Sequence, residues 1–343
     1  MQAAILEAPG RLVIRDVPVP QPGPGAVVIR VRAATTCGTD LKAYTRGHPK
    51  MPMPTRFGHE YAGEIVALGA GVTGWAVGDA VMGVQTAPCG ACYWCERGQE
   101  ELCPQVMERA AWGAYAEYLE LPPHIVRRNL YPKPPELPFA QAALLEPLAS
   151  VLRGQRALTL RPDDTVLIVG AGPIALLHLI ALRAAGLHAL YVSGRHAARL
   201  ALATALGATV SDADTTDAGT VLRSVTEGRG ADVVIECTGR LAVWEQVVGW
   251  VRRGGQVCLF GGCPPGSTVT WETGRLHYDE VRVVSPFHFA PRDVRAARDL
   301  LLHLSGPASP FGRLLTAAAP LADLPAVFER LRAGEGVKYV IVP

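Results

Sequence analysis

TVLIVGAGPIA, residues 165–175, is the stretch that decides the fold of this chain. Its β-branched apolar half predicts a buried strand, and a helical pattern follows the glycines. The G-x-G-x-x-A spacing lets the backbone turn tightly and approach a pyrophosphate, while the helix N-terminus offers free N–H groups. We therefore expect Gly170, Gly172, Pro173 and Ile174 to contact a dinucleotide.

Strand and helix patterns alternate on both sides of this stretch. Residues 189–192, 209–210, 232–236, 256–260 and 281–285 read as further strands, and helical patterns lie between them. This alternation predicts an α/β protein with a doubly wound parallel sheet. Residues 1–149 instead show short strand patterns broken by Gly and Pro, which is typical of antiparallel β structure. We predict one β-rich domain from residues 1–149 and 287–343, and a dinucleotide-binding domain over residues 150–286.

Bulk composition excludes several function classes. The chain has 343 residues and a formal net charge of +2, which is too small to favour nucleic acid or an anionic membrane as a partner. The apolar helical pattern at residues 174–185 is too short to span a bilayer. No signal-peptide pattern opens the sequence, so we expect a cytoplasmic protein whose eight cysteines bind metal or stay free.

Four cysteines are packed into one short stretch with the spacing C-x2-C-x2-C-x7-C: Cys89, Cys92, Cys95 and Cys103. Four thiolates fill a tetrahedral zinc shell and leave no position for substrate, so this site is predicted to be structural. An iron–sulfur run has similar early spacing but a shorter last gap, and it remains the alternative.

A second set of possible ligands is spread along the sequence. Cys37 lies in CGTD, His59 and Glu60 lie in a stretch that reads G-H-E-x2-G-x5-G-x2-V, and Glu146 precedes Pro147. Each residue alone is weak evidence, because single cysteines and acids are usually structural. Together they match a family signature, and the chain resembles the zinc-containing alcohol dehydrogenases of the medium-chain family. The sorbitol, threonine and secondary-alcohol dehydrogenase branches are the most similar.

This resemblance covers nearly the whole chain and implies a GroES-like catalytic domain beside a Rossmann domain. It implies that Cys37, His59 and Glu146 bind a catalytic zinc, with Glu60 as a fourth ligand or a group that exchanges with water. Together with the cysteine cluster, this gives two zinc ions per chain. Zinc with an exchangeable position acts as a Lewis acid on an alcohol oxygen.

The proton route is also implied by the resemblance. Thr39 matches the family's hydroxyl relay next to the metal. The outer relay histidine of several relatives is replaced here by Lys42, and an ammonium is a poorer relay at neutral pH. His48 is a substitute candidate.

The residues after the second strand of the doubly wound pattern indicate the cofactor. NAD enzymes place an acid here, but this chain reads Ser193-Gly194-Arg195. Glycine leaves room for a 2′-phosphate and arginine can bind it, so we predict NADP(H) over NAD(H). The alternative is a solvated arginine beside an NAD site. By resemblance, Thr238 and Gly261 belong to loops beside the ribose and nicotinamide.

These patterns together predict an oxidoreductase that interconverts a secondary alcohol, polyol or sugar hydroxyl with its carbonyl. An amino-alcohol (threonine-type) dehydrogenase or an aldehyde reductase is the alternative within the family. A non-catalytic protein that binds a dinucleotide and zinc is the alternative from another class. Relatives imply a homodimer or homotetramer, with a small-molecule alcohol or carbonyl compound as substrate.

Overall fold

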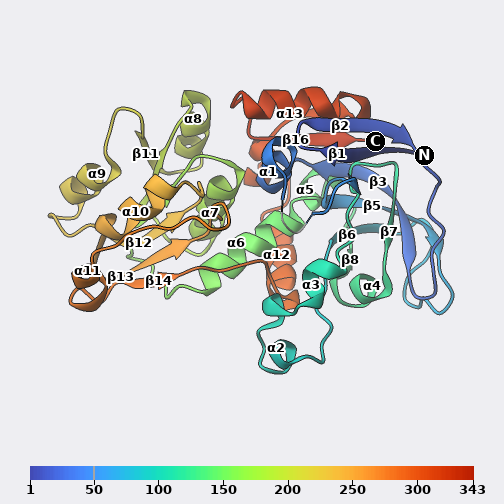
Figure 1. Ribbon diagram of the computed structural model, residues 1–343, viewed down its shortest axis with the longest axis horizontal. Coiled ribbons are helices and arrows are strands. Elements are labelled where there is room, and N and C mark those ends of the chain that lie inside the picture. The colour runs from blue at the N-terminus through green and yellow to red at the C-terminus, as the bar shows by residue number, and fades with distance from the viewer. Residues whose placement is uncertain (49–50) are drawn as a thin grey trace. The chain divides into compact units, whose positions relative to one another are not determined.

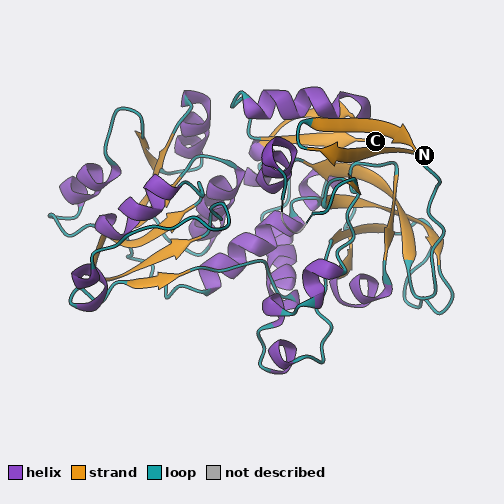
Figure 2. Ribbon diagram, in the orientation of Figure 1, coloured by secondary structure: helices purple, strands orange, loops and turns teal. Residues whose placement is uncertain are grey.

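The computed structural model describes residues 1–48 and 51–343, and Figures 1 and 2 show the course of the chain. The described chain divides into two compact units. The first unit joins Met1–Ala149 with Phe289–Pro343, and the second is Ser150–His288. The first unit is therefore built from both ends of the chain, with the second unit inserted between them.

The first unit is a mainly antiparallel β structure, as the broken strand patterns predict. Its larger sheet has the strand order β15 (Leu315–Pro320), β16 (Lys338–Val342), β3 (Val27–Thr35), β5 (Glu60–Leu68), β6 (Ala80–Val84) and β8 (Leu130–Pro132), and β7 (Tyr118–Leu121) pairs with β3. Its smaller sheet has the order β2 (Arg11–Asp16), β1 (Gln2–Ala8) and β4 (Thr55–Arg56). The alanine-rich β15 has low strand propensity, which is why the sequence pattern does not predict it.

Helices of the first unit lie between and beside these strands. They are α1 (Gly38–Arg46), α2 (Tyr93–Glu96), α3 (Gln105–Glu108), α4 (Pro123–Asn129), α5 (Phe139–Ala142), α12 (Pro291–His303) and α13 (Leu324–Arg332), while α6 (Leu145–Arg156) runs from the first unit into the second. The core contains an aromatic cluster in which the Phe328 ring lies 5.5 Å from Phe57 and 6.2 Å from Tyr115. These rings close the space between α13 and the strands.

The second unit confirms the predicted doubly wound parallel sheet. Its strand order is β11 (Thr209–Asp212), β10 (Leu190–Gly194), β9 (Val166–Val169), β12 (Ala231–Glu236), β13 (Val251–Leu259) and β14 (Arg282–Val284), and every pairing is parallel. Its helices are α7 (Pro173–Ala184), α8 (Ala197–Ala205), α9 (Ala218–Val225), α10 (Leu241–Trp250) and α11 (Thr273–His277). The strand order reverses between β9 and β12, which is where such sheets open a ligand crevice at their carboxyl edge.

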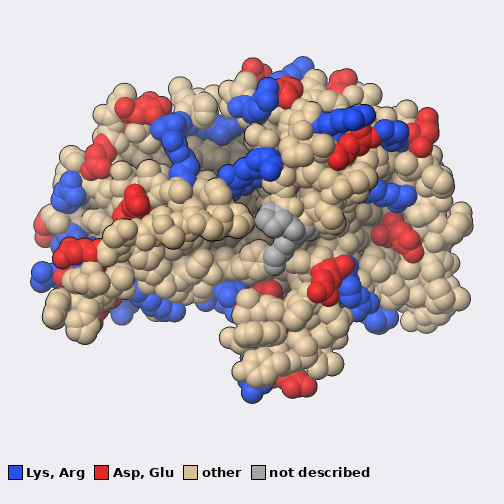
Figure 3. All heavy atoms as spheres, in the orientation of Figure 1, with Lys and Arg blue, Asp and Glu red and all other residues tan. Residues whose placement is uncertain are grey.

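Acidic and basic side chains are interspersed over the face drawn in Figure 3, in keeping with the low net charge. Among the described residues, no helix is both long enough and apolar enough to cross a membrane.

Strands β3 and β5 approach each other so closely that Gly63 has no room for a side chain. A Cβ atom at this position would lie 2.2 Å from the carbonyl oxygen of Arg30. Backbone cannot move aside as a flexible side chain can, so the sheet must open to accept a methyl group.

We therefore predict that Gly63→Ala lowers the free energy of unfolding by about 1–3 kcal/mol, the usual cost of overpacking. Urea denaturation measures this change. Gly249→Ala is the control, because a Cβ there meets nothing within 4 Å and alanine is a better helix former than glycine. Equal stability of the Gly63→Ala variant and the parent would contradict the prediction.

Candidate functional site

The N-terminus of α1 places Cys37 at one side of the candidate metal centre. Cys37 is the N-cap of α1, and its sulfur accepts a hydrogen bond of 3.4 Å from the backbone N–H of Thr39. The positive end of a helix dipole and a donated N–H both favour a thiolate, the form of cysteine that binds metal. The exposed Thr39 lies next to that sulfur.

The next ligands are His59, which directly precedes β5, and Glu60, the first residue of that strand. One candidate atom each from Cys37, His59 and Glu60 lie within 4.8 Å of one another, so one cation can touch all three. Glu146, at the start of α6, lies beside them, with its Oε2 4.0 Å from His59 Nε2. Among the described residues the close group thus contains Glu60, the expected fourth ligand, and Glu146 lies next to it through its contact with His59.

A buried carboxylate holds the histidine. Asp40 Oδ1 lies 3.0 Å from His59 Nδ1, and Asp40 Oδ2 accepts a hydrogen bond of 2.8 Å from the Tyr115 hydroxyl. Burial lowers the pKa of His59, but the Asp40 and Cys37 groups outweigh it and raise this pKa well above its usual value. The pocket therefore attracts positive charge at the imidazole, which is an environment that also suits a metal cation at Nε2.

A lysine from the far end of the chain holds Glu60. Lys338, on β16, is almost fully buried, and its Nζ lies 2.5 Å from Glu60 Oε2 and 2.6 Å from the carbonyl oxygen of Thr36. Thr35 donates a short hydrogen bond to the same carboxylate oxygen. Burial raises the pKa of Glu60, while Lys338 and His59 lower it.

The other oxygen of Glu60 has no hydrogen-bond partner among the described residues, although it is buried. An unsatisfied buried oxygen is costly unless a further ligand meets it. This orphaned atom, together with a sulfur, an imidazole and a second carboxylate, fits a zinc ion better than a cation of the harder, all-oxygen type.

The four clustered cysteines form a separate site. One sulfur from each of Cys89, Cys92, Cys95 and Cys103 lies within 4.8 Å of the others. Sulfur–sulfur separations of 3.5 Å (Cys92 to Cys95) and 3.9 Å (Cys89 to Cys95) bracket the edge of about 3.8 Å that a tetrahedron with Zn–S bonds of about 2.3 Å requires. None of the eight cysteines, all of which lie within the described residues, forms a disulfide.

Hydrogen bonds prepare this cysteine cluster for a cation. The backbone N–H of Gly90 donates to Cys95 Sγ at 3.3 Å, and that of Cys89 donates to Cys103 Sγ at 3.4 Å. A backbone hydrogen bond from Ala91 lowers the pKa of Cys89 to about 6, whereas burial raises that of Cys95 to about 12. A divalent cation would replace the protons of such a mixed cluster.

In the second unit, the turn after β9 forms a cradle at the start of α7. Gly170 has φ +113°, which favours glycine, and Gly172 is the N-cap of α7 with Pro173 as its first residue. A Cβ at Gly172 would meet nothing within 4 Å, so open space lies in front of the helix N-terminus. This is the arrangement that binds a pyrophosphate.

The end of β10 presents the predicted specificity residues. Ser193 is buried, and its carbonyl oxygen accepts a hydrogen bond from the Gly170 N–H. A Cβ at Gly194 would lie 2.6 Å from the Cβ of Ala171. Glycine at this position therefore also lets β10 pack closely against residues 170–172, which we call the pyrophosphate turn. Arg195 is exposed, and its Nε lies 2.9 Å from Asp214 Oδ1.

Sequence reasoning gave no role to three residues that matter for the metal centre: Asp40, Gln85 and Lys338. Gln85 Nε2 donates to Glu146 Oε1 at 2.9 Å and so orients that carboxylate. The sequence could have pointed to Asp40, because it follows the candidate ligand Cys37 by one turn of helix. It could also have pointed to Lys338, which is a rare lysine in an otherwise apolar terminal strand.

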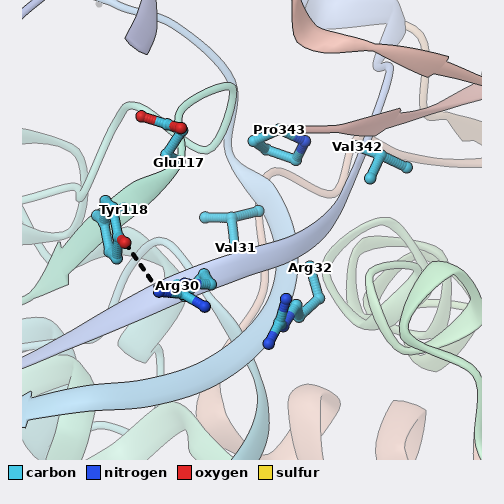
Figure 4. Close-up of a pocket in the computed structure, with 7 residues that line it drawn as sticks. All are labelled: Arg30, Val31, Arg32, Glu117, Tyr118, Val342 and Pro343. Carbon is cyan, nitrogen blue, oxygen red and sulfur yellow. Dashed lines mark hydrogen bonds between the residues drawn. The ribbon is translucent and has the colours of Figure 1, made fainter. Parts of the chain in front are cut away.

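The pocket drawn in Figure 4 lies elsewhere on the first unit. Its lining comes from β3, β7 and the C-terminal residues, where Arg30 donates to the Tyr118 hydroxyl at 3.0 Å. None of the predicted metal ligands lines it among the described residues. It is therefore not part of the candidate metal centre.

Comparison with known proteins gives two family matches. Residues 23–134 match the alcohol dehydrogenase GroES-like domain, and residues 173–303 match the zinc-binding dehydrogenase domain. The chain is 31% identical to the sorbitol dehydrogenase of Bacillus subtilis (strain 168), over 84% of this chain and 83% of the relative. It is 33% identical to the L-threonine 3-dehydrogenase of Symbiobacterium thermophilum, over 98% and 96%.

A solved structure is similar over the full length. A zinc-binding dehydrogenase from Sinorhizobium meliloti 1021 bound to NADP has a TM-score of 0.89 and 30% sequence identity, covering 100% of this chain and 99% of that chain. The GroES-like and Rossmann folds expected from the sequence are thereby confirmed.

The buried pair of Lys338 and Glu60 yields a stability prediction. Lys338→Met should lower the free energy of unfolding by about 3–5 kcal/mol, because it leaves a buried carboxylate without its cation. The double variant Lys338→Met/Glu60→Gln should recover a large part of this loss, since the charge that needed compensation is gone.

A double-mutant cycle in urea, with Glu60→Gln alone as the fourth corner, measures the coupling. Additive effects of the two changes would show that the pair does not stabilise the fold.

Proposed function

Because the chain belongs to the zinc-containing medium-chain alcohol dehydrogenase family, and is thus a zinc-dependent oxidoreductase, we propose that it oxidises secondary alcohols or polyols with NADP and reduces the matching ketones with NADPH. The main support for this proposal is that Cys37, His59 and Glu60 lie close together, with Glu146 beside them. Three of these residues on zinc, with Glu60 exchanging with water, leave a position for a substrate oxygen, unlike the four-sulfur cluster.

The residues around the centre have separable tasks in this proposal. Zinc bound by the mixed shell would supply Lewis-acid chemistry to an alcohol or carbonyl oxygen. Asp40 holds the imidazole of His59 in one orientation, and Gln85 does the same for Glu146. Thr39, exposed beside Cys37, exchanges a proton with the substrate hydroxyl through its own hydroxyl. Lys42 and His48 are the candidates for passing that proton to water.

The sorbitol dehydrogenase relative supports a polyol substrate. The threonine dehydrogenase relative supports the second candidate, an amino alcohol. A panel of sorbitol, 2,3-butanediol and L-threonine, assayed with and without a chelator, separates the two. Catalytic efficiency highest for L-threonine would favour the amino-alcohol assignment.

NADP preference rests on the charge at the end of β10. Arg195 is exposed there and Gly194 carries no carboxylate, so a 2′-phosphate meets a cation. The similar structure with bound NADP supports the same assignment.

The domain limits 1–149 with 287–343, and 150–286, belong to this proposal, as do a homodimeric or homotetrameric assembly and a cytoplasmic location.

The metal assignment predicts two zinc ions per chain, measured by elemental analysis of the purified enzyme. His59→Ala should retain one zinc and lose activity, whereas Cys92→Ala should lose the other zinc and mainly stability. The exposed His303→Ala is the control and should retain both. A single zinc in the parent enzyme that Cys92→Ala removes and His59→Ala does not would defeat the proposed mechanism.

The cofactor assignment predicts that Arg195→Asp lowers kcat/KM for NADP by about 10- to 100-fold, the scale of a lost charge-assisted hydrogen bond. The value for NAD should change far less. Arg229→Asp, an exposed arginine of the same unit, is the matched control. Gly194→Asp would be a poorer test, since its Cβ also meets Ala171. A parent enzyme that prefers NAD would refute the assignment.

A further inference from the structure

Strand β12 ends in a buried carboxylate that several neutral donors surround. Glu236 is fully buried, yet the donors that it meets are neutral groups. Its Oε1 accepts from the backbone N–H of Thr238 at 2.6 Å and of Gly239 at 3.0 Å, and the Thr238 hydroxyl donates to the same oxygen. Its Oε2 accepts from the indole N–H of Trp244 at 3.0 Å. Burial raises the pKa of this carboxyl, and these hydrogen bonds oppose the rise.

The same carboxylate joins two loops of the sheet edge. The Trp244 indole N–H also donates to the carbonyl oxygen of Gly261, at 3.0 Å, in the loop after β13. The backbone N–H of Gly261 donates to the carbonyl oxygen of Glu236 at 2.9 Å. A Cβ at Gly261 would lie 2.3 Å from the nitrogen of Gly239, and one at Gly239 would lie 2.5 Å from the carbonyl oxygen of Gly262. The two loops are thus locked against each other.

These loops lie at the carboxyl edge of the sheet beside the reversal point, where sheets of this type bind a dinucleotide. The strand order places β12 next to β9 at the reversal point, and a Cβ at Gly170 would lie 3.3 Å from Thr238 Cγ2. Thr238 therefore borders the pyrophosphate turn. Its hydroxyl donates to Glu236 and accepts from the Arg240 N–H at 3.2 Å, so its polar atom is engaged by the protein and its methyl group faces Gly170.

We propose that Glu236 is a positioning residue for the nicotinamide half of the dinucleotide. In such a fold, the half that contains the G-x-G-x-x-A turn binds one mononucleotide. The second half, here β12 to β14, binds the other. Glu236 acts through Thr238, Gly239 and Gly261, whose backbone it fixes before the cofactor arrives. The proposal rests on the dinucleotide site proposed above and is independent of the preference between NADP and NAD.

Glutamine at position 236 tests this role with little change in shape. With the NH2 group in the place of Oε2, that position can no longer accept from Trp244, or from the Gly239 N–H, which also donates to Oε2 at 3.2 Å. The NH2 group then faces N–H donors inside the protein, and we expect the contact between the two loops to loosen. Loops that are already ordered before the cofactor binds lose little entropy on binding and so raise affinity. Loosening these loops should therefore weaken binding of the nicotinamide half of the cofactor.

The experiment compares two ligands by titration calorimetry on the zinc-loaded enzyme: NADPH, and 2′-phospho-ADP-ribose, which lacks nicotinamide. Glu236→Gln should raise the Kd of NADPH by at least about tenfold, the scale of a buried donor left without its acceptor, and that of 2′-phospho-ADP-ribose by less than about twofold. Glu245→Gln, an exposed carboxylate on α10, should change neither value.

Equal weakening of both ligands would show general damage to the unit and overturn the proposal, as would an unchanged Kd for NADPH. If Glu236→Gln does not fold, Trp244→Phe removes one donor and keeps the ring, and it should weaken NADPH alone. If Trp244→Phe then weakens both ligands equally or neither, the proposal is overturned. A parent enzyme that binds NADH more tightly than NADPH would refute only the cofactor preference, and the same comparison would be made with NADH and ADP-ribose.

Discussion

The burial of Glu60 is the constraint on which the first unit depends. A carboxylate withdrawn from water requires compensation, by an opposite charge or by several hydrogen-bond donors, because the free-energy cost of desolvation is large. The compensation comes from Lys338 on β16, close to the C-terminus, while the donor Thr35 comes from β3. The candidate metal centre of the N-terminal segment therefore has a compensated Glu60 only when the C-terminal strand pairs with β3. This requirement explains why both ends of the chain form one unit.

The two units satisfy their buried carboxylates in different ways, and the difference suits their tasks. Glu60 is held by a cation at one oxygen, which leaves its other oxygen available beside Cys37 and His59. Both oxygens of Glu236 accept hydrogen bonds from N–H donors, and one of them also accepts from a hydroxyl, so neither oxygen is open to a ligand. The first arrangement keeps a potential metal ligand ready, and the second makes the surrounding backbone rigid.

Cofactor preference depends on weaker and more exposed interactions. The ion pair of Arg195 with Asp214 lies at the surface, where such pairs contribute about 0–1 kcal/mol. A 2′-phosphate carries more charge than one carboxylate and can accept two hydrogen bonds from the guanidinium. A 2′-phosphate would compete with Asp214 for the Arg195 guanidinium, so the ion pair is compatible with the proposed use of NADP.

The sequence by itself determined the doubly wound sheet, the antiparallel unit and the grouping of the cysteines, because these follow from local period and spacing. The alternation around TVLIVGAGPIA predicted a doubly wound parallel sheet but not the order of its strands, and thiolates with two residues between them are neighbours in any compact loop. Only the tertiary structure decided that Asp40 faces His59, that Lys338 neutralises Glu60, and that Glu236 ties Thr238 to Gly261. Buried charges leave no periodic trace in a sequence, since their partners are selected by the packing of strands that are distant along the chain.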